Sequence, residues 1–462
     1  MSLIIFIVAL LVRLAFYALY LRFNPCMLMY DSGHYHTMAQ HLLQYGGFMD
    51  AHGLIDTYRL PGYPLFLSAC YQFTGVIPQG ALWVQLILGS LIPVLIYYLA
   101  LRITDSLRVA LIAAMVSCLH VGLVLFAGLV MTETIFGVLF LLFLYVLLGA
   151  QTSRNFLVAG LLLGLCNLIR PLAFLPLAVV GALMSFETAT TSLPQDERHW
   201  RFALILRSLS RQAKSVSKDM SAFKPPIAFL LGWSLPPALW VLRNFLHTGM
   251  LLLHTFNGPH LLNHAAVRVY ALAHHTSHQQ AQQQVYAQLP STHESDPNRQ
   301  QMVVSQQQEA QTIKILLRYP LQTMLLGAIN CFKTVCSLYS SELLCIDSGG
   351  QLPSYDDSLN LGGRLKRLLC PEVTTGWLRV LIWYEILMHL LLLLGAAGFV
   401  VQRLRQRTLS RTLVLLLLIS VVCVAQTAAC GFARLRLPIE PILIMVAVMF
   451  YTSRVSNKGK RA

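Results

Sequence analysis

Charged residues are scarce in this sequence, and their scarcity argues against a soluble protein. Only 11% of the 462 residues are Asp, Glu, Lys or Arg, whereas a soluble domain carries about a quarter. The mean hydropathy is +0.62, and several apolar runs reach the ~20 residues that cross ~30 Å of hydrocarbon. Because helices satisfy their own backbone hydrogen bonds in lipid, the sequence predicts an all-α polytopic membrane protein.

Acidic residues are scarcer still, with 19 Asp and Glu against 34 Lys and Arg, a formal net charge of +15. Much of this positive charge lies in short segments between apolar runs and in the C-terminal tail, which holds Arg454, Lys458, Lys460 and Arg461. This distribution indicates the positive-inside bias and contact with anionic membrane lipids. We therefore expect membrane lipids as partners and no nucleic acid.

The chain also lacks the motifs of several enzyme classes. It has no glycine-rich phosphate loop, no internal repeat and no soluble nucleotide-binding unit, which an enzyme using nucleotide sugars normally needs. The ten cysteines include no CxxC pair, and a disulfide among Cys336, Cys345 and Cys370 stays open. Eight of the fifteen histidines fall between 247 and 293 without tight ligand spacing. This pattern favours a solvated His-rich loop over a metal site.

Ten spanning helices are predicted, and residues 2–21 are interpreted as a retained first helix rather than a cleaved signal. The positive-inside rule places both termini inside and residues 22–80 and 247–378 outside. Segment 321–340 is interpreted as an interfacial or buried helix, because a further crossing would move the arginines of 403–411 outside. The predicted spans are about 2–21, 81–101, 109–128, 132–150, 156–169, 171–186, 226–246, 379–401, 412–430 and 438–453.

Three regions follow from this topology. Residues 1–246 form a membrane core that includes the first outer loop, residues 247–378 form a polar outer loop with the interfacial helix, and residues 379–462 form the C-terminal transmembrane helices. The basic segment 187–225 is either an amphipathic helix on the inner leaflet or a solvated linker.

Two acids are candidates for chemistry on the outer side. Asp31 begins a predicted helix that carries Tyr35 on its apolar face and ends at Gly46. Asp31 is either a helix cap or a base that takes the proton of an acceptor hydroxyl. Glu133 begins an apolar helix after Thr132, and it either complements the helix dipole or lines the same cavity as Asp31.

Several outer arginines are candidates for phosphate binding, because a guanidinium stays charged and binds phosphate bidentately. Arg434 and Arg436 lie on the outer side, against the positive-inside trend. Arg59 and Tyr63 belong to a rigid Arg-Leu-Pro-Gly-Tyr-Pro turn that either re-enters the bilayer or faces the cavity. Further candidates are Arg170 before Pro171, Arg243 with Asn244 after Trp240, and Lys333. Each of these residues also has an alternative interpretation as an ordinary side chain at the membrane interface that contacts no substrate.

In this order, these motifs resemble the GT-C superfamily of membrane glycosyltransferases. The bacterial branch near the dolichyl-phosphate-mannose protein mannosyltransferases and the lipid A aminoarabinose transferase is the most similar. The resemblance implies a helical first outer loop and a polyprenyl-phosphate sugar as donor. The match departs at Asp31-Ser32, where many members carry paired acids. It therefore leaves a divalent metal open and establishes no other cofactor.

Together these features predict an inverting glycosyltransferase of the bacterial inner membrane with a periplasmic active site. Asp31 and Glu133 would be its catalytic residues. The donor phosphate would contact Arg434, Arg436, Arg59, Arg170 and Arg243, and the substrate cavity would include Tyr35, Tyr63, Asn244 and Lys333. The acceptor would be a lipid, a glycan or a protein. The alternative function is a transporter or flippase of a lipid or anionic solute, which usually shows inverted repeats.

Overall fold

The computed structural model describes residues 1–19, 31–49, 52–171, 223–291, 294–340, 342–343 and 376–459, together with 177–178, 181 and 183. These parts are mainly helical, and Met49 and Ile55 form an isolated β-bridge. The prediction of an all-α membrane fold is confirmed. Residues 187–222 of the basic segment, most of the span at 171–186, Cys345 and Cys370 lie outside the described residues.

The first half of the chain forms the membrane core. Its helices are α1 (Ser2–Leu19), α4 (Pro78–Thr104), α5 (Leu107–Cys118), α7 (Glu133–Leu148), α8 (Ser153–Ile169) and α11 (Lys224–Thr248). Two further helices, α2 (Ser32–Tyr45) and α3 (Gly62–Thr74), belong to the first outer loop. The predicted helical first outer loop is therefore confirmed.

The predicted span at 109–128 is not one straight helix. Helix α5 ends at Cys118, and the chain continues after a 60° bend as α6 (Val121–Leu125) and η2 (Phe126–Gly128). His120 lies at the break, where its ring accepts a hydrogen bond from the backbone N–H of Leu123 at 3.4 Å and caps the new helix. A break inside an apolar stretch leaves backbone N–H groups without helical partners. The His120 ring supplies such a partner, which permits the break.

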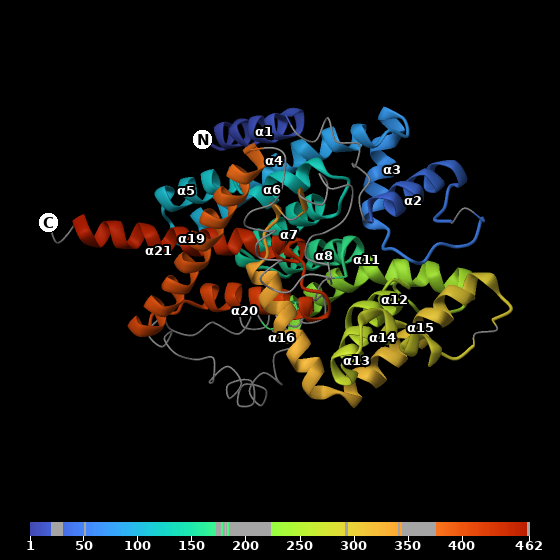
Figure 1. Cartoon of the computed structure of the whole chain (residues 1–462). Coiled ribbons are helices and arrows are strands. Elements are labelled where there is room, and N and C mark those ends of the chain that lie inside the picture. Colours follow the sequence, from blue (N-terminus) through green and yellow to red (C-terminus); the bar gives the residue numbers. More distant parts are fainter. Residues whose placement is uncertain are drawn as a thin grey trace.

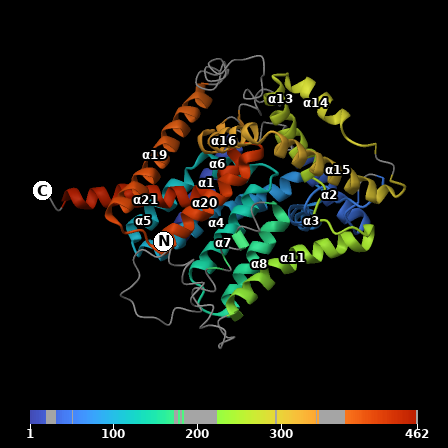
Figure 2. The same cartoon turned by 90° about the horizontal axis from the view of Figure 1, so that it is seen from below.

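The outer segment and the C-terminal helices complete the described fold. The outer segment contains α12 (Asn257–Leu261), the π-helix η5 (Leu262–Ala266), α13 (Val267–His274), α14 (His278–Ala287), α15 (Pro297–Arg318) and α16 (Pro320–Cys336). The C-terminal part contains α19 (Gly376–Gln406), α20 (Arg411–Ala425), η7 (Gln426–Ala429), η8 (Ala433–Ile439) and α21 (Glu440–Gly459). Figure 1 shows α2 and α12–α15 at the end of the molecule opposite both termini, and Figure 2 shows the same separation.

Six described helices are long and apolar enough to cross a membrane, or seven if the bent pair counts as one span. Helices α7 and α8 are apolar but shorter. The chain is a multi-pass membrane protein, and the number of ten crossings stays a prediction. Segment 321–340 contains α16, which packs by one face against η7 and η8 and exposes Leu321, Met324 and Phe332 on another.

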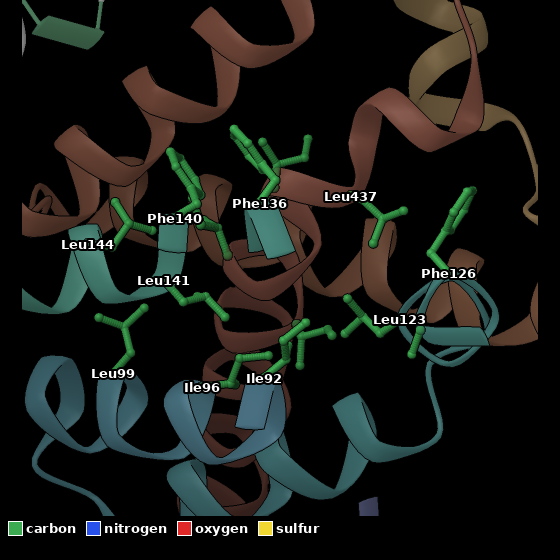
Figure 3. Packing of buried hydrophobic residues seen from close by; sticks show 14 of the residues in the cluster. Ile92, Ile96, Leu99, Leu123, Phe126, Phe136, Phe140, Leu141, Leu144 and Leu437 are labelled. Atoms are coloured by element: carbon green, nitrogen blue, oxygen red, sulfur yellow. The ribbon is translucent and has the colours of Figure 1, made fainter. Parts of the chain in front are cut away.

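Apolar side chains of α4, α7 and η8 form the centre of the core. Figure 3 shows Ile92 and Ile96 of α4 facing Phe136 and Phe140 of α7, with Leu437 beside them. Helices α8 and α11 approach more closely through glycine. A Cβ added to Gly160 would lie 2.1 Å from the carbonyl oxygen of Phe229, so only glycine permits this contact, as is common between membrane helices.

Candidate active site

Asp31 lies between two arginines that are distant in sequence. Its carboxylate oxygens accept from Arg59 Nη2 at 2.6 Å and from Arg434 Nη2 at 3.4 Å. The Asp31 side chain is 24% exposed, and those of Arg59 and Arg434 are 11% and 18% exposed. Asp31 stands at the N-terminus of α2 but makes no side-chain capping bond. Asp31 therefore makes ion pairs and no capping hydrogen bond, and its role as a base stays a prediction.

Three separate elements build this cluster. Asp31 precedes α2, Arg59 lies in the turn before α3, and Arg434 lies in η8 directly before the last helix. The hydroxyl of Ser32 donates to the sulfur of Met131 at 3.3 Å, which fixes the start of α2 next to the start of α7. The first outer loop and the C-terminal part therefore meet at one carboxylate.

The arginines determine the protonation of Asp31. Burial alone would raise the pKa of its carboxyl group, but the charges of Arg434 and Arg59 and the hydrogen bond from Arg59 lower the pKa below its usual value. Asp31 is therefore ionised at neutral pH and is a weak base while both arginines remain bound to it. A ligand that withdraws the arginines would make Asp31 more basic.

A second ion pair lies nearby. Arg170 Nη1 is 3.1 Å from Glu133 Oε1, and the side chains are 10% and 0% exposed. Thr132 donates to the other carboxylate oxygen at 3.3 Å instead of capping α7. Arg170 and Glu133 act electrostatically on Asp31 and Tyr35, respectively, so the two ion pairs form one charged region. Arg170 is thus paired with a buried carboxylate, and its contact with a donor phosphate stays a prediction.

A pocket extends from this second pair into the apolar core. Glu133 and Arg170 are the charged residues of its lining, and the other lining side chains are mainly apolar groups of α4, α6, η2, α7 and η8. They include Ile92, Phe140 and Leu437, which come from α4, α7 and η8 and are labelled in Figure 3. The pocket therefore has a polar end beside the ion pairs and an apolar interior.

A row of aromatic rings and histidines connects the two arginines that bind Asp31. Arg59 lies over the ring of Phe256 at 4.1 Å, and His260 stacks on Phe256 at 4.6 Å. His264 follows at 4.6 Å from His260. The row ends at Phe432, which lies 5.9 Å from His264 and 5.6 Å from the Arg434 guanidinium.

The sequence did not identify His260 and His264 as candidate site residues, because the His-rich segment was interpreted as a solvated loop. Phe256, His260 and His264 recur at four-residue spacing, and this helical pattern could have revealed them. Burial, His264 and Arg434 lower the pKa of His260 to about 3, and burial and Arg268 lower the pKa of His264. Both imidazoles are therefore neutral at physiological pH.

Arg436 does not join the Asp31 cluster. Its Nε donates to Glu440 at 2.5 Å, and Nη1 donates at 2.8 Å to the carbonyl oxygens of Thr334, Val335 and Ser337. Glu440 also pairs with His120 at 3.3 Å and accepts from the Tyr339 hydroxyl at 2.9 Å. Arg436 is 1% exposed. The phosphate contact expected for Arg436 therefore has no support in its surroundings, which use the guanidinium to hold α16 and α21.

Arg243 and Asn244 fasten the outer loops instead of lining the cluster. Arg243 donates to the carbonyl oxygens of Phe48 and Asp56 at 2.7 and 3.2 Å. Asn244 donates to Leu252 and Leu253 at 2.9 and 3.3 Å. Both residues of α11 thereby hold backbone segments that surround the first outer loop.

The remaining residues that were predicted to line the substrate cavity lie in different surroundings. Tyr35 is buried and lies 5.5 Å below the Arg59 guanidinium. Tyr63 is fully buried, and its hydroxyl donates to Gln85 at 2.9 Å, so it does not line an open cavity as predicted. Lys333 lies on the exposed side of α16. No group of three or more His, Cys, Asp or Glu side chains suited to a metal ion occurs among the described residues.

No protein-family model matches the sequence, and no curated protein is similar to it. Solved structures with a similar arrangement include AglB, the oligosaccharyltransferase of Archaeoglobus fulgidus, in complex with an inhibitory peptide and a dolichol-phosphate. It is 12% identical with a TM-score of 0.45, over 98% of this chain and 50% of that chain. The same enzyme tethered to an acceptor peptide gives a TM-score of 0.48 at 12% identity, over 98% and 49%.

ArnT from Cupriavidus metallidurans bound to undecaprenyl phosphate is 13% identical with a TM-score of 0.35, over 92% of this chain and 74% of that chain. AglB and ArnT are both GT-C glycosyltransferases, the superfamily that the sequence motifs resemble. The chain spans about half the length of the oligosaccharyltransferase. At these TM-scores, function has to follow from the geometry of the site.

Proposed function

We propose that this protein is an inverting glycosyltransferase. It moves a sugar from a polyprenyl-phosphate donor to an acceptor hydroxyl on the outer, periplasmic side of the bacterial inner membrane. The observation that carries this proposal is the clamp of Arg59 and Arg434 on the two carboxylate oxygens of Asp31. Such a transfer requires a carboxylate as base and cations that bind the phosphate, and this cluster contains both.

The two arginines provide the electrostatic part of the reaction. A phosphate leaving group needs cations more than a proton, and fixed cations in a partly dry site stabilise its developing charge. Arg59 and Arg434 can exchange a carboxylate for a phosphate, because guanidinium binds both groups in the same planar fashion.

Asp31 provides the proton transfer. When the arginines turn to the donor phosphate, Asp31 loses the charges that lower its pKa and becomes a better base. The acceptor hydroxyl then transfers its proton to the Asp31 carboxylate as its oxygen bonds to the anomeric carbon. The bond from that carbon to the phosphate oxygen breaks on the opposite face, and the electron pair leaves with the polyprenyl phosphate, so the configuration inverts.

The test uses purified full-length protein in lipid nanodiscs, radiolabelled polyprenyl-phosphate sugars and a membrane extract. We expect wild type to move label to an acceptor, whereas Arg434→Gln should raise the donor KM about tenfold, the value of one charged hydrogen bond. Arg436→Gln is a poor control because it should unfold the core, so Arg405→Gln at the exposed end of α19 is used instead. Absence of transfer from any donor by folded protein would contradict the proposal and favour transport.

A further inference from the structure

The two histidines of the aromatic row pack against other rings and have free ring nitrogens. His260 stacks on Phe256, its ring is tilted by 49° relative to that of His264, and His264 makes a T-shaped contact with Phe432. No ring nitrogen of His260 or His264 makes a hydrogen bond to any other described residue, although both side chains are only partly exposed. Neighbouring His274 differs, because its Nε2 lies 2.8 Å from the Tyr319 hydroxyl.

The local backbone explains how both rings reach the same side. Phe256 directly precedes α12, His260 lies within α12, and His264 lies within the π-helix η5 that follows. One π-helical turn inside an α-helical stretch shifts the register of the side chains and is frequent at functional sites. Gly258 keeps α12 close to α15, because a Cβ there would lie 2.5 Å from the carbonyl oxygen of Ser305. The row is therefore part of a rigid segment.

The row lies beside the clamp. Its ends are Arg59 and Arg434, and these arginines meet again at Asp31. A sugar in the donor is one glycosidic bond away from the phosphate that the arginines would bind. Each neutral imidazole offers one donor and one acceptor nitrogen, which suits a hydroxyl group, since a hydroxyl both donates and accepts.

We propose that His260 and His264 form a subsite that hydrogen-bonds the hydroxyl groups of the donor sugar. Phe256 and Phe432 hold the two imidazoles in place, and the ring edges recognise the sugar. This inference rests on the proposed function and adds the residues that distinguish a glycosylated lipid phosphate from the bare one. Both imidazoles stay neutral, so their hydrogen bonding is independent of pH in the physiological range.

The experiment compares binding of lipids rather than transfer. Full-length protein in nanodiscs is titrated with undecaprenyl phosphate and with undecaprenyl phosphate carrying glucose, mannose, galactose or N-acetylglucosamine. We expect wild type to bind at least one glycosylated lipid about three- to tenfold more tightly than the bare lipid, the size of one hydrogen bond. His260→Phe and His264→Phe keep an aromatic ring in the row but lose the nitrogens. Each should lose the preference and keep its affinity for undecaprenyl phosphate.

His247→Phe is the matched control, because His247 is exposed near the end of α11, and it should behave as wild type. Rescue of the preference by His260→Gln, which restores hydrogen-bonding groups, would support the subsite. Three results would overturn it: no sugar preference in wild type, an intact preference in both Phe variants, or equal loss of bare and glycosylated lipid. The last result would mean that the rings only position the arginines.

Two further outcomes have separate meanings. Failure of wild type to bind undecaprenyl phosphate at all would contradict the proposed function, whatever the histidine variants do. In the transfer assay, a rise in the acceptor KM of the Phe variants with an unchanged preference in binding would place the histidines at an acceptor sugar and overturn their assignment to the donor.

Discussion

Asp31→Asn should have opposite effects on lipid binding and on transfer. Asparagine removes the negative charge that Arg59 and Arg434 now neutralise. A donor phosphate would then no longer compete for these arginines or meet a neighbouring carboxylate. One charged hydrogen bond contributes about 1.5–3 kcal/mol. The lower end applies here because the cluster is partly exposed and solvent screens it. We therefore expect undecaprenyl phosphate to bind about tenfold more tightly, since each 1.4 kcal/mol is a factor of ten.

The same change should reduce transfer, because general base catalysis contributes about 10²- to 10⁴-fold. Equilibrium binding of undecaprenyl phosphate and single-turnover transfer in nanodiscs measure the two effects separately. Asp105→Asn is the matched control, because Asp105 is exposed after α4 with φ 53°, a conformation that Asn tolerates. Weaker binding of the lipid by Asp31→Asn would refute the competition between carboxylate and phosphate. Unchanged transfer would remove Asp31 as the base.

Three further predictions concern the ion pairs. Glu133→Gln leaves Arg170 buried without its partner, so it should destabilise the protein by about 3–5 kcal/mol, and Arg170→Gln added to it should recover part of the loss in thermal unfolding. Arg436→Met should destabilise the protein by a similar amount, because it leaves the buried Glu440 without its partner. The double variant Arg436→Met, Glu440→Met should recover the stability of the core and bind undecaprenyl phosphate as wild type does. Finally, because the pKa of Asp31 is lowered, its contribution to stability is present above pH ~4 and is lost as pH falls through the lower folded-state pKa. The difference in Tm between wild type and Asp31→Asn should therefore be constant near neutrality and shrink below pH ~4.

The sequence was sufficient for the fold class, and it singled out the three residues that form the Asp31 cluster, whose roles stay predictions. Apolar runs predicted the membrane helices, and the outer placement of Asp31, Arg59 and Arg434 made them candidates before their contacts were known. Pattern alone could not show that both arginines meet on one carboxylate, because Asp31 and Arg434 are 403 residues apart. That contact depends on the packing of η8 against α6 and α7.

The errors also have physical causes. The prolines that flank Tyr63 suggest a turn that faces a cavity, but the Tyr63 hydroxyl donates a hydrogen bond to the amide oxygen of Gln85 within the core. The histidines were interpreted as solvated because they lack the spacing of metal ligands. His260 and His264 instead repeat at the spacing of a helix face. Residues 109–128 do not form the single predicted helix, because the His120 side chain caps a new helix inside the apolar run.

Arg434 and Arg436 show how two neighbouring arginines acquire different roles. They lie two residues apart in the 3₁₀-helix η8. Three residues form one turn of such a helix, so these side chains leave it in different directions. Arg436 is tied to Glu440 and to three carbonyl oxygens near the end of α16, which fixes η8 against the membrane core.

Arg434 gains from this anchoring because its own partner is exchangeable. A guanidinium that must release a carboxylate and bind a phosphate loses less free energy when its backbone is already fixed, since less conformational entropy remains to be lost on binding. Gly431, with φ 64°, permits the tight turn before η8, where a Cβ would lie 2.9 Å from the backbone of Asn330. The closed network around Arg436 thus holds the segment from which Arg434 reaches Asp31, and the unpaired Glu440 of the single Arg436→Met variant should also weaken the outer clamp.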